Sequence, residues 1–453
     1  MRVHILGVSG TFMAALAFLA RDAGFDVTGS DEHCYPPMSD LLSEKGIQWT
    51  EGYEDCSHML KADAVIVGNA MKRGMTVIET LLDTDIPYFS GPEWLAQHIL
   101  PRYRVMAVSG THGKTTTTSM LAHILFEAGL EPGFLIGGVA ANFNTSARLG
   151  TGEWFVIEAD EYDTAFFDKR PKFMHYRPEI AILNNLEFDH ADIYANLGEI
   201  QKQFHYLLRT IAPKGLVIAP KSDQALQEVM ARGVYSHCEH LSLDGDATWC
   251  AELLDSSGQA FRVLHHGKQV AEIHWSLIGQ FNIENALAAF AASARAGVKP
   301  EIAAKALESF IPVKRRLEVK SKRHDICIYD DFAHHPTAIN KTIQALKASG
   351  RHQRILVVLE FASHTMRTGV HQKTLVHVFD DVDAAYFLKP AEFSLESLSP
   401  QWQFSHQILE TTDDIVEAIG QDARAGDAVL VMSNRGFEGI HQRLAQRLDQ
   451  RFS

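Results

Sequence analysis

The chain has 453 residues, with 42 basic against 56 acidic side chains and a formal net charge of −14. At about 150 residues per domain, this length predicts three domains. Charged residues make up 22% and apolar residues 46%, as in ordinary globular proteins. Gly (31) and Pro (15) are near or below average, which excludes collagen-like or low-complexity disorder. The acidic balance argues against nonspecific nucleic-acid binding, which needs a basic surface, but it allows a locally basic pocket for a phosphorylated ligand.

Five scattered cysteines and the absence of a CxxC pair predict a reduced, cytosolic protein without disulfides or a zinc knuckle. The longest apolar stretch, Phe12–Ala20, is nine residues long and too short for a membrane span. A signal peptide is the alternative for this N-terminus. Gly7, Ser9 and Gly10 disfavour it, because they stand where a strand–turn–helix needs them.

Residues 2–31 predict a β–α–β unit, whose parts are a strand at Val3–Leu6, a turn at Gly7–Met13, a helix at Ala14–Ala23 and a strand at Phe25–Gly29. Only Gly7 and Gly10 fit a dinucleotide-type turn, and their spacing is not G-x-G-x-x-G. A tight turn without a ligand is therefore an equal alternative. Asp31 favours a ligand, because an acidic side chain after the second strand can accept a hydrogen bond from a ribose hydroxyl.

Alternating strands and helices along the rest of the chain predict parallel sheets. The other expected strands are 64–67, 86–89, 105–108, 155–157, 180–183, 326–329, 355–359, 384–388 and 428–432. Pro101 and Pro312 mark the expected boundaries. We therefore predict an α/β chain of three domains: a Rossmann-like N-terminal domain (1–101), a P-loop ATPase-type central domain (102–312) and a Rossmann-like C-terminal domain (313–453).

A strand at Val105–Val108 leads through Ser109-Gly110-Thr111-His112-Gly113-Lys114-Thr115-Thr116 into an expected helix from about Thr117 to Ala128. This order predicts a phosphate-binding loop, because the N–H groups and the dipole at a helix start attract anions. Lys114 can reach the β- and γ-phosphates, and the Thr115 hydroxyl can ligate Mg²⁺. The match departs from G-x-x-x-x-G-K-[ST], since Val108 stands at the first glycine position.

Polar side chains follow the next two strands. Glu158-Ala159-Asp160-Glu161 comes directly after 155–157, and Asn184 to His190 comes after 180–183. The carboxyl ends of parallel strands face the ligand, and Mg²⁺ takes one or two carboxylates. The alternatives are a solvated acidic turn and a histidine whose hydrogen bonds are purely structural.

Two clusters lie further along. Asn282 and Asn285 share a helix face and can hydrogen-bond a nucleobase, although capping by Asn282 explains the spacing equally well. The segment Asp330 to Thr337, with its acids and paired histidines, follows a strand and predicts a site; a plain connecting loop is the alternative. The basic run 314–316 can neutralise phosphate charge or form a solvated hinge.

In this order, the motifs resemble those of the Mur ligase family, the ATP-dependent amide-forming enzymes of peptidoglycan synthesis, over essentially the whole chain. The resemblance implies an ATP site formed by Gly110, Thr111, His112, Gly113, Lys114, Thr115, Thr116, Asn282, Asn285, Arg316 and Asp331. It implies Mg²⁺ held by Thr115, Glu158 and His190, with Lys114, Glu158 and His190 as catalytic residues. It implies substrate binding by Gly10, Thr11, Ser30, Asp31, Asn69, His334, Arg367 and Asn434.

Finer features resemble the branch that joins UDP-N-acetylmuramate to the murein tripeptide L-alanyl-γ-D-glutamyl-meso-diaminopimelate. They are Tyr35–Met38, Gly68–Met71, Glu161–Asp163, Phe166–Arg170, Asn185–Asp192 and Val431–Asn434. The resemblance implies that ATP phosphorylates the lactyl carboxylate and that the L-alanine amine of the tripeptide attacks the acyl phosphate, with His334 or His335 as candidate bases. The alternatives are an L-alanine-adding ligase, a regulatory ATPase without ligation, and an NAD-dependent oxidoreductase, which the missing third glycine disfavours.

Three segments depart from the family pattern. Phe281 stands where a histidine is usual, and Phe361–His364 stands where Pro-Arg-Ser-Asn is common. The second change removes an arginine that could hold a peptide carboxylate, and Arg367 is the expected substitute. Ser433–Gly439 also has fewer glycines than the family segment.

Overall fold

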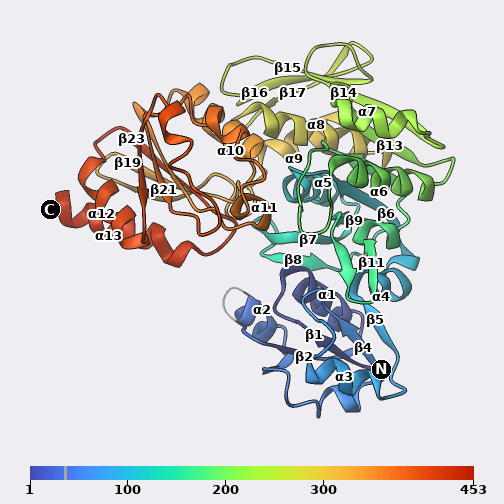
Figure 1. Ribbon diagram of the computed structural model, residues 1–453. Helices are drawn as coiled ribbons and strands as arrows, with labels where there is room; N and C mark the ends of the chain where they lie inside the picture. Colours follow the sequence, from blue (N-terminus) through green and yellow to red (C-terminus); the bar gives the residue numbers. More distant parts are fainter. Residues whose placement is uncertain (35–37, 453) are drawn as a thin grey trace.

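The structure, a computed structural model, describes residues 1–34 and 38–452. Three large sheets follow one another along the chain, from the blue N-terminal part through the green and yellow centre to the red C-terminal part (Figure 1). This confirms the predicted α/β architecture. The boundaries at 101 and 312 stay predictions. Of the branch-specific segments, residues 35–37 lie outside the described residues.

The N-terminal sheet is parallel, with the strand order β3-β2-β1-β4-β5. Its strands are β1 (Arg2–Leu6), β2 (Asp26–Asp31), β3 (Gln48–Glu51), β4 (Ala64–Val67) and β5 (Tyr88–Ser90). Its helices are α1 (Thr11–Asp22), α2 (Met38–Glu44), α3 (Thr76–Leu82) and α4 (Gly91–His98).

Helix α1 explains the longest apolar run of the sequence. Every residue from Met13 to Ala20 is buried, because α1 packs on its own sheet and also on a hairpin of the central sheet, β7 (Gly133–Ala140) and β8 (Thr145–Arg148). Figure 1 shows α1 directly against these two strands. Within residues 1–34 and 38–452, every helix is too short or too polar to cross a bilayer.

The central sheet has ten strands in the order β17-β16-β15-β14-β13-β12-β6-β9-β7-β8. Besides β7 and β8 they are β6 (Arg104–Ser109), β9 (Trp154–Glu158), β12 (Ile180–Leu183), β13 (Leu216–Pro220), β14 (His237–Ser242), β15 (Trp249–Leu253), β16 (Ala260–His265) and β17 (Lys268–His274). All pairs from β15 to β7 are parallel, whereas the pairs β7–β8, β15–β16 and β16–β17 are antiparallel. The sequence did not predict the antiparallel additions.

Successive residues of β6 face two different layers of helices, as expected for a strand buried on both faces. Met106 and Val108 pack under α5 (Lys114–Glu127), α8 (Gln280–Arg295) and α9 (Pro300–Glu308). Val105 and Ala107 face the layer of α6 (Leu197–Thr210) and α7 (Gln224–Ala231). A small antiparallel hairpin, β10 (Asp163–Ala165) and β11 (Asp168–Pro171), follows β9.

The C-terminal sheet has the order β18-β19-β23-β20-β21-β22, and all its pairs are parallel except β18–β19. Its strands are β18 (Glu318–Arg323), β19 (Ile326–Asp331), β20 (Arg354–Leu359), β21 (Ala384–Leu388), β22 (Ser405–Leu409) and β23 (Asp427–Met432). Its helices are α10 (Pro336–Ser349), α11 (His364–Arg367), α12 (Thr412–Asp422) and α13 (Ile440–Phe452). Short 3₁₀ turns lie at Met59–Lys61, Leu100–Arg102, Lys172–His175, Thr374–His377, Ser399–Gln401 and Phe437–Gly439.

Each strand predicted from the sequence is present, with ends shifted by at most a few residues. Several predicted boundaries were wrong. Helix α1 begins at Thr11 rather than at Ala14, so Thr11–Met13 belong to the helix and not to the turn before it. Asp31 and Glu158 are the last residues of β2 and β9 rather than residues that follow these strands. The helix after the phosphate loop begins at Lys114 rather than near Thr117, because Gly113 is its N-cap. Asp330 and Asp331 lie within β19 rather than after it, since strand pairing continues through both residues.

Candidate active site

The loop between β6 and α5 requires glycine at two positions. Gly113 has φ +78°, and a Cβ there would lie 2.3 Å from Asn285 Oδ1. Gly110 has φ +134°, and its Cβ would lie 2.9 Å from the Asn185 carbonyl oxygen. The loop is thus pressed between the segment after β12 and helix α8. This close packing explains why a shortened glycine pattern still forms a tight loop.

The segment after β12 fixes the shape of the loop. The Asn185 carbonyl accepts the Thr111 N–H at 3.1 Å, and the Asn185 side chain accepts the His112 N–H at 2.7 Å. Asn285 Oδ1 accepts the Thr117 hydroxyl at 3.1 Å. Asn285 therefore touches the phosphate loop. Asn282 is not the helix cap, since α8 is capped by Gly279 and the Asn282 amide donates to the Ile278 carbonyl.

Lys114 is a mostly buried cation among acids. Its ammonium donates to the Gly110 carbonyl at 2.7 Å and to Glu161 Oε2 at 3.0 Å, and it lies 3.7 Å from Asp160 Oδ1. Burial lowers the pKa of Lys114, but the neighbouring carboxylates of Glu161, Asp160 and Glu158 outweigh burial and hold this pKa above its usual value. The lysine stays charged where an anionic phosphate would meet it.

Two groups of possible cation ligands surround this lysine. The Thr115 hydroxyl donates to Glu158 Oε1 at 3.0 Å, and Glu158 Oε2 accepts the Gly137 N–H at 2.7 Å. His190 Nε2 lies 3.0 Å from Glu161 Oε1, and the ligand atoms of His190, Glu161 and Asp160 all lie within 4.8 Å of one another. Such oxygen-rich sets suit Mg²⁺.

The sequence-predicted trio of Thr115, Glu158 and His190 is therefore divided between these two groups. Sequence reasoning missed Glu161 and Asp160 as partners of His190, although both stand in the acidic run that it singled out. It also missed Lys172, whose ammonium lies 3.3 Å from Asp160 Oδ2. Burial raises the pKa of Asp160, but Lys172, Lys114 and His190 together lower it below its usual value, so the carboxylate stays ionised.

The C-terminal domain adds residues to the same edge of the central sheet. The Arg316 guanidinium donates to Thr115 Oγ1 at 3.2 Å. The Asp331 carboxylate accepts the N–H groups of Leu317 and Ala333 at 2.6 and 2.8 Å, which holds the segment around Arg316 in place. His334 Nδ1 lies 2.8 Å from the Phe332 carbonyl, and burial lowers the pKa of His334, so its imidazole is neutral.

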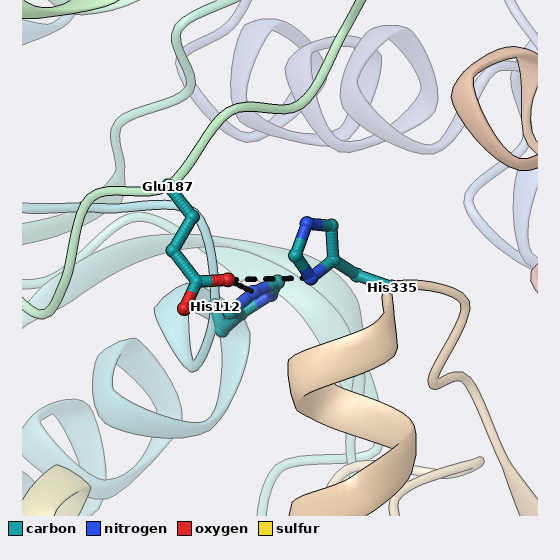
Figure 2. A group of neighbouring side chains, drawn as sticks. All are labelled: His112, Glu187 and His335. Atoms are coloured by element: carbon teal, nitrogen blue, oxygen red, sulfur yellow. Dashed lines mark hydrogen bonds and ion pairs between the residues drawn. The ribbon is translucent and has the colours of Figure 1, made fainter. Parts of the chain in front are cut away.

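Figure 2 shows a further contact between the two domains, formed by His112, Glu187 and His335. Glu187 Oε2 lies 3.1 Å from His112 Nε2 and 3.3 Å from His335 Nδ1, while Oε1 accepts the Thr337 hydroxyl at 3.1 Å. Burial raises the pKa of Glu187, but the hydrogen bond from His112 and the nearby imidazoles lower it to about 2. The sequence did not predict this contact.

The predicted substrate residues of the N-terminal domain lie at or just after the carboxyl ends of β1, β2 and β4. Asp31 Oδ2 accepts the Ser9 N–H at 2.8 Å, which ties the turn to β2. Gly10 is the N-cap of α1, and Thr11 is its first residue. Ser30 is buried, with its hydroxyl 3.3 Å from His4 Nε2, whereas Asn69 is exposed.

Two further predicted substrate residues lie in the C-terminal domain. Arg367 Nε forms an ion pair with Glu392 at 2.5 Å, so its guanidinium already has an acidic partner. Asn434 Oδ1 is buried without a hydrogen-bond partner among the described residues.

Comparisons with known proteins agree with this geometry. Three family models match: "Mur ligase family, catalytic domain" over residues 2–103, "Mur ligase middle domain" over 108–293 and "Mur ligase, glutamate ligase domain" over 315–435. The chain therefore belongs to the Mur ligase family, which confirms the resemblance. It is an enzyme that forms amide bonds in an ATP-dependent reaction.

Individual relatives cover nearly the full length. The chain is 48% identical to the UDP-N-acetylmuramate--L-alanyl-gamma-D-glutamyl-meso-2,6-diaminoheptandioate ligase of Haemophilus influenzae, over 98% of this chain and 99% of that one. It is 30% identical to the UDP-N-acetylmuramate--L-alanine ligase of Methylococcus capsulatus, over 99% and 96%. The crystal structure of a murein peptide ligase from Psychrobacter arcticus matches with a TM-score of 0.77 and 44% identity, over 99% and 98%.

Proposed function

We propose that the protein joins UDP-N-acetylmuramate to the tripeptide L-alanyl-γ-D-glutamyl-meso-diaminopimelate, with cleavage of ATP to ADP and phosphate, in peptidoglycan recycling. The main support is the 48% identity, over nearly the whole of both chains, to a relative named for this substrate pair. The relative named for L-alanine is only 30% identical. Five unpaired cysteines support a cytoplasmic location.

In this mechanism the lactyl carboxylate attacks the γ-phosphorus of ATP, and ADP leaves. The amine of the tripeptide then attacks the acyl phosphate carbon, so that the C–N bond forms and the C–O bond to phosphate breaks. Phosphoryl transfer depends on positioning and on neutralising charge. Lys114 and Arg316 would supply fixed positive charge at the transferred group.

Mg²⁺ would be held by Thr115 and Glu158, and by His190 with Asp160 and Glu161. The donor set fits, because it offers hydroxyl, carboxylate and imidazole ligands on one buried edge. Bound there, Mg²⁺ neutralises phosphate charge.

The attacking amine must lose a proton. His334 is the base that we propose, because its Nδ1–H donates to the Phe332 carbonyl and leaves Nε2 with a lone pair. Burial lowers its pKa, so the imidazole is ready to accept a proton at neutral pH. His335 is less suited, since both its ring nitrogens already have partners.

Release of ADP by the purified protein, with ATP, Mg²⁺ and UDP-N-acetylmuramate, tests the proposal. We expect rapid release with the tripeptide, slow release with L-alanine and almost none without an amine. A preference for L-alanine would identify the L-alanine-adding ligase instead, and release without any amine would indicate a regulatory ATPase.

A further inference from the structure

Glu187 and His335 have no part in the reaction proposed above, yet both are held against the phosphate loop. Glu187 follows β12 in the central domain, and His335 is the N-cap of α10 in the C-terminal domain. Figure 2 shows that the imidazoles of His112 and His335 both face the Glu187 carboxylate. His335 is 5% exposed, and the rings of His112 and His335 lie 4.7 Å apart.

The hydrogen bonds of His335 assign its protons. Its Nδ1 accepts the Thr337 N–H at 3.3 Å, as the side chain of an N-cap does, so this nitrogen bears no hydrogen. Its Nε2 faces the Phe188 carbonyl oxygen at 3.3 Å and therefore bears the hydrogen of the neutral ring. Nδ1 nonetheless lies 3.3 Å from Glu187 Oε2. Two lone pairs thus face one another, which is unfavourable unless a positive charge lies between them.

Two of the three distances in this group match those between ligands of a tetrahedral metal ion. With bonds of about 2.0–2.1 Å to nitrogen and oxygen, two ligands of a tetrahedral Zn²⁺ lie about 3.3 Å apart. The two imidazole nitrogens lie 3.1 and 3.3 Å from Glu187 Oε2, and all three ligand atoms lie within 4.8 Å of one another. The other carboxylate oxygen is already bound by the Thr337 hydroxyl, which leaves Oε2 as a single-oxygen ligand.

We propose that His112 Nε2, Glu187 Oε2 and His335 Nδ1 form a binding site for Zn²⁺ that bridges the central and C-terminal domains. Two imidazoles and one carboxylate suit Zn²⁺ rather than Mg²⁺, which prefers oxygen ligands and six-fold coordination. The fourth position is open to water. His112 binds through Nε2 once its ring hydrogen moves to Nδ1.

This site is separate from the oxygen-rich groups around Glu158 and Glu161. Because its ligands come from two domains, Zn²⁺ binds only while His335 lies over the phosphate loop. By mass action the ion therefore stabilises that arrangement of the domains.

Titration of the metal-free full chain with Co²⁺, with Mg²⁺ in excess, tests the proposal, because four-coordinate Co²⁺ absorbs visible light far more strongly than six-coordinate Co²⁺. We expect strong absorption that Zn²⁺ abolishes at one ion per chain. Glu187→Gln and His335→Asn should each weaken binding by at least about tenfold. Asparagine is chosen at 335 because it is also a good N-cap. X-ray absorption of the Zn²⁺ complex should show two imidazole ligands.

Two control variants separate this site from others. His324→Gln removes an exposed histidine of the C-terminal domain, and His190→Gln removes the histidine of the other candidate metal group. Both should bind Co²⁺ and Zn²⁺ as the wild type does. The proposal is wrong if Glu187→Gln or His335→Asn retains wild-type affinity, if His190→Gln alone abolishes binding, or if the absorption is that of six-coordinate Co²⁺.

Discussion

Two strand–turn–helix units of the molecule share one topology and differ in chemistry: the N-terminal corner (residues 2–22) and the central corner (residues 104–127). In each, a parallel strand leads through a glycine turn into a helix, β1 into α1 and β6 into α5. At the first corner, α1 is buried and apolar, and the carboxylate of Asp31 holds the turn by accepting the Ser9 N–H. At the second, the helix begins with a mostly buried lysine surrounded by carboxylates from the segment that follows β9.

The comparison shows that a strand–turn–helix corner supplies N–H groups for binding an anion, and that reactivity needs further charged side chains. The central corner has Lys114, Glu158 and Arg316, which can act on a group whose charge changes during the reaction. The N-terminal corner has none of these among its described residues and is suited to hold a substrate without reacting with it. Changes at the central corner should therefore lower kcat, whereas changes at the N-terminal corner should raise the KM for UDP-N-acetylmuramate.

Replacing the buried lysine should have the largest effect. We expect Lys114→Ala to lower kcat by about 10³-fold, because one preorganised charge at the transferred group is lost. Release of ADP with both co-substrates measures it. Lys221→Ala, which removes an exposed lysine paired with Asp246, is the matched control and should keep the wild-type rate. Equal activity of Lys114→Ala and wild type would refute the role of the central corner.

A methyl group on the phosphate loop should have the next largest effect. Gly113→Ala places a Cβ 2.3 Å from Asn285 Oδ1, in addition to the cost of about 1–2 kcal/mol for a left-handed residue. We expect a loss of about 2–4 kcal/mol in the free energy of unfolding and weakened ATP binding, measured by urea unfolding and calorimetry.

Gly129→Ala is the control for backbone strain, because Gly129 also has positive φ but open space around its Cβ. It should cost about 1–2 kcal/mol of stability and leave ATP binding unchanged. Equal losses in the two variants would show that packing on Asn285 is unimportant.

At the N-terminal corner, Asp31→Asn should raise the KM for UDP-N-acetylmuramate about tenfold with kcat unchanged, since a hydrogen bond to a charged group contributes about 1.5 kcal/mol. Initial rates at varied UDP-N-acetylmuramate measure both constants. Asp26→Asn, at the exposed start of the same strand, should change neither. A fall in kcat with constant KM at Asp31 would contradict the proposed division between the corners.

The smallest effect concerns the hairpin β10–β11, which follows β9 and contacts helix α4 of the N-terminal domain. Burial raises the pKa of Asp168, but two hydrogen bonds from the Arg170 guanidinium and one from its N–H lower this pKa to about 2, below the ordinary 3.8. Because the folded pKa is lowered, the stabilisation is complete above about pH 4 and is lost as the pH falls toward 2. The difference in urea midpoint between wild type and Asp168→Asn should thus shrink from pH 6 to pH 2.5. A constant difference would show that the ion pair is not the cause.

The sequence predicted what depends on local pattern. The strand 105–108, the glycine loop and Lys114 lie close together in the chain, so their arrangement follows from neighbouring residues. The partner of His190 could not be predicted, because Glu161 reaches it only through the bend after β9. The contact of Glu187 with His335 joins residues of two domains, and only the packing of those domains brings them together. The predicted role of Arg367 in peptide binding stays a prediction, and its ion pair with Glu392 is a contact that the sequence did not predict.

The central claim is that the terminal phosphoryl group of ATP passes to the muramate carboxylate before the amide forms. UDP-N-acetylmuramate labelled with ¹⁸O in its lactyl carboxylate tests this directly, with mass spectrometry of the phosphate released in the presence of the tripeptide. The mechanism predicts one ¹⁸O atom in each phosphate, because the carboxylate oxygen leaves with the phosphoryl group. Phosphate without the label would contradict the mechanism, since ATP would then be cleaved by water and not used for ligation.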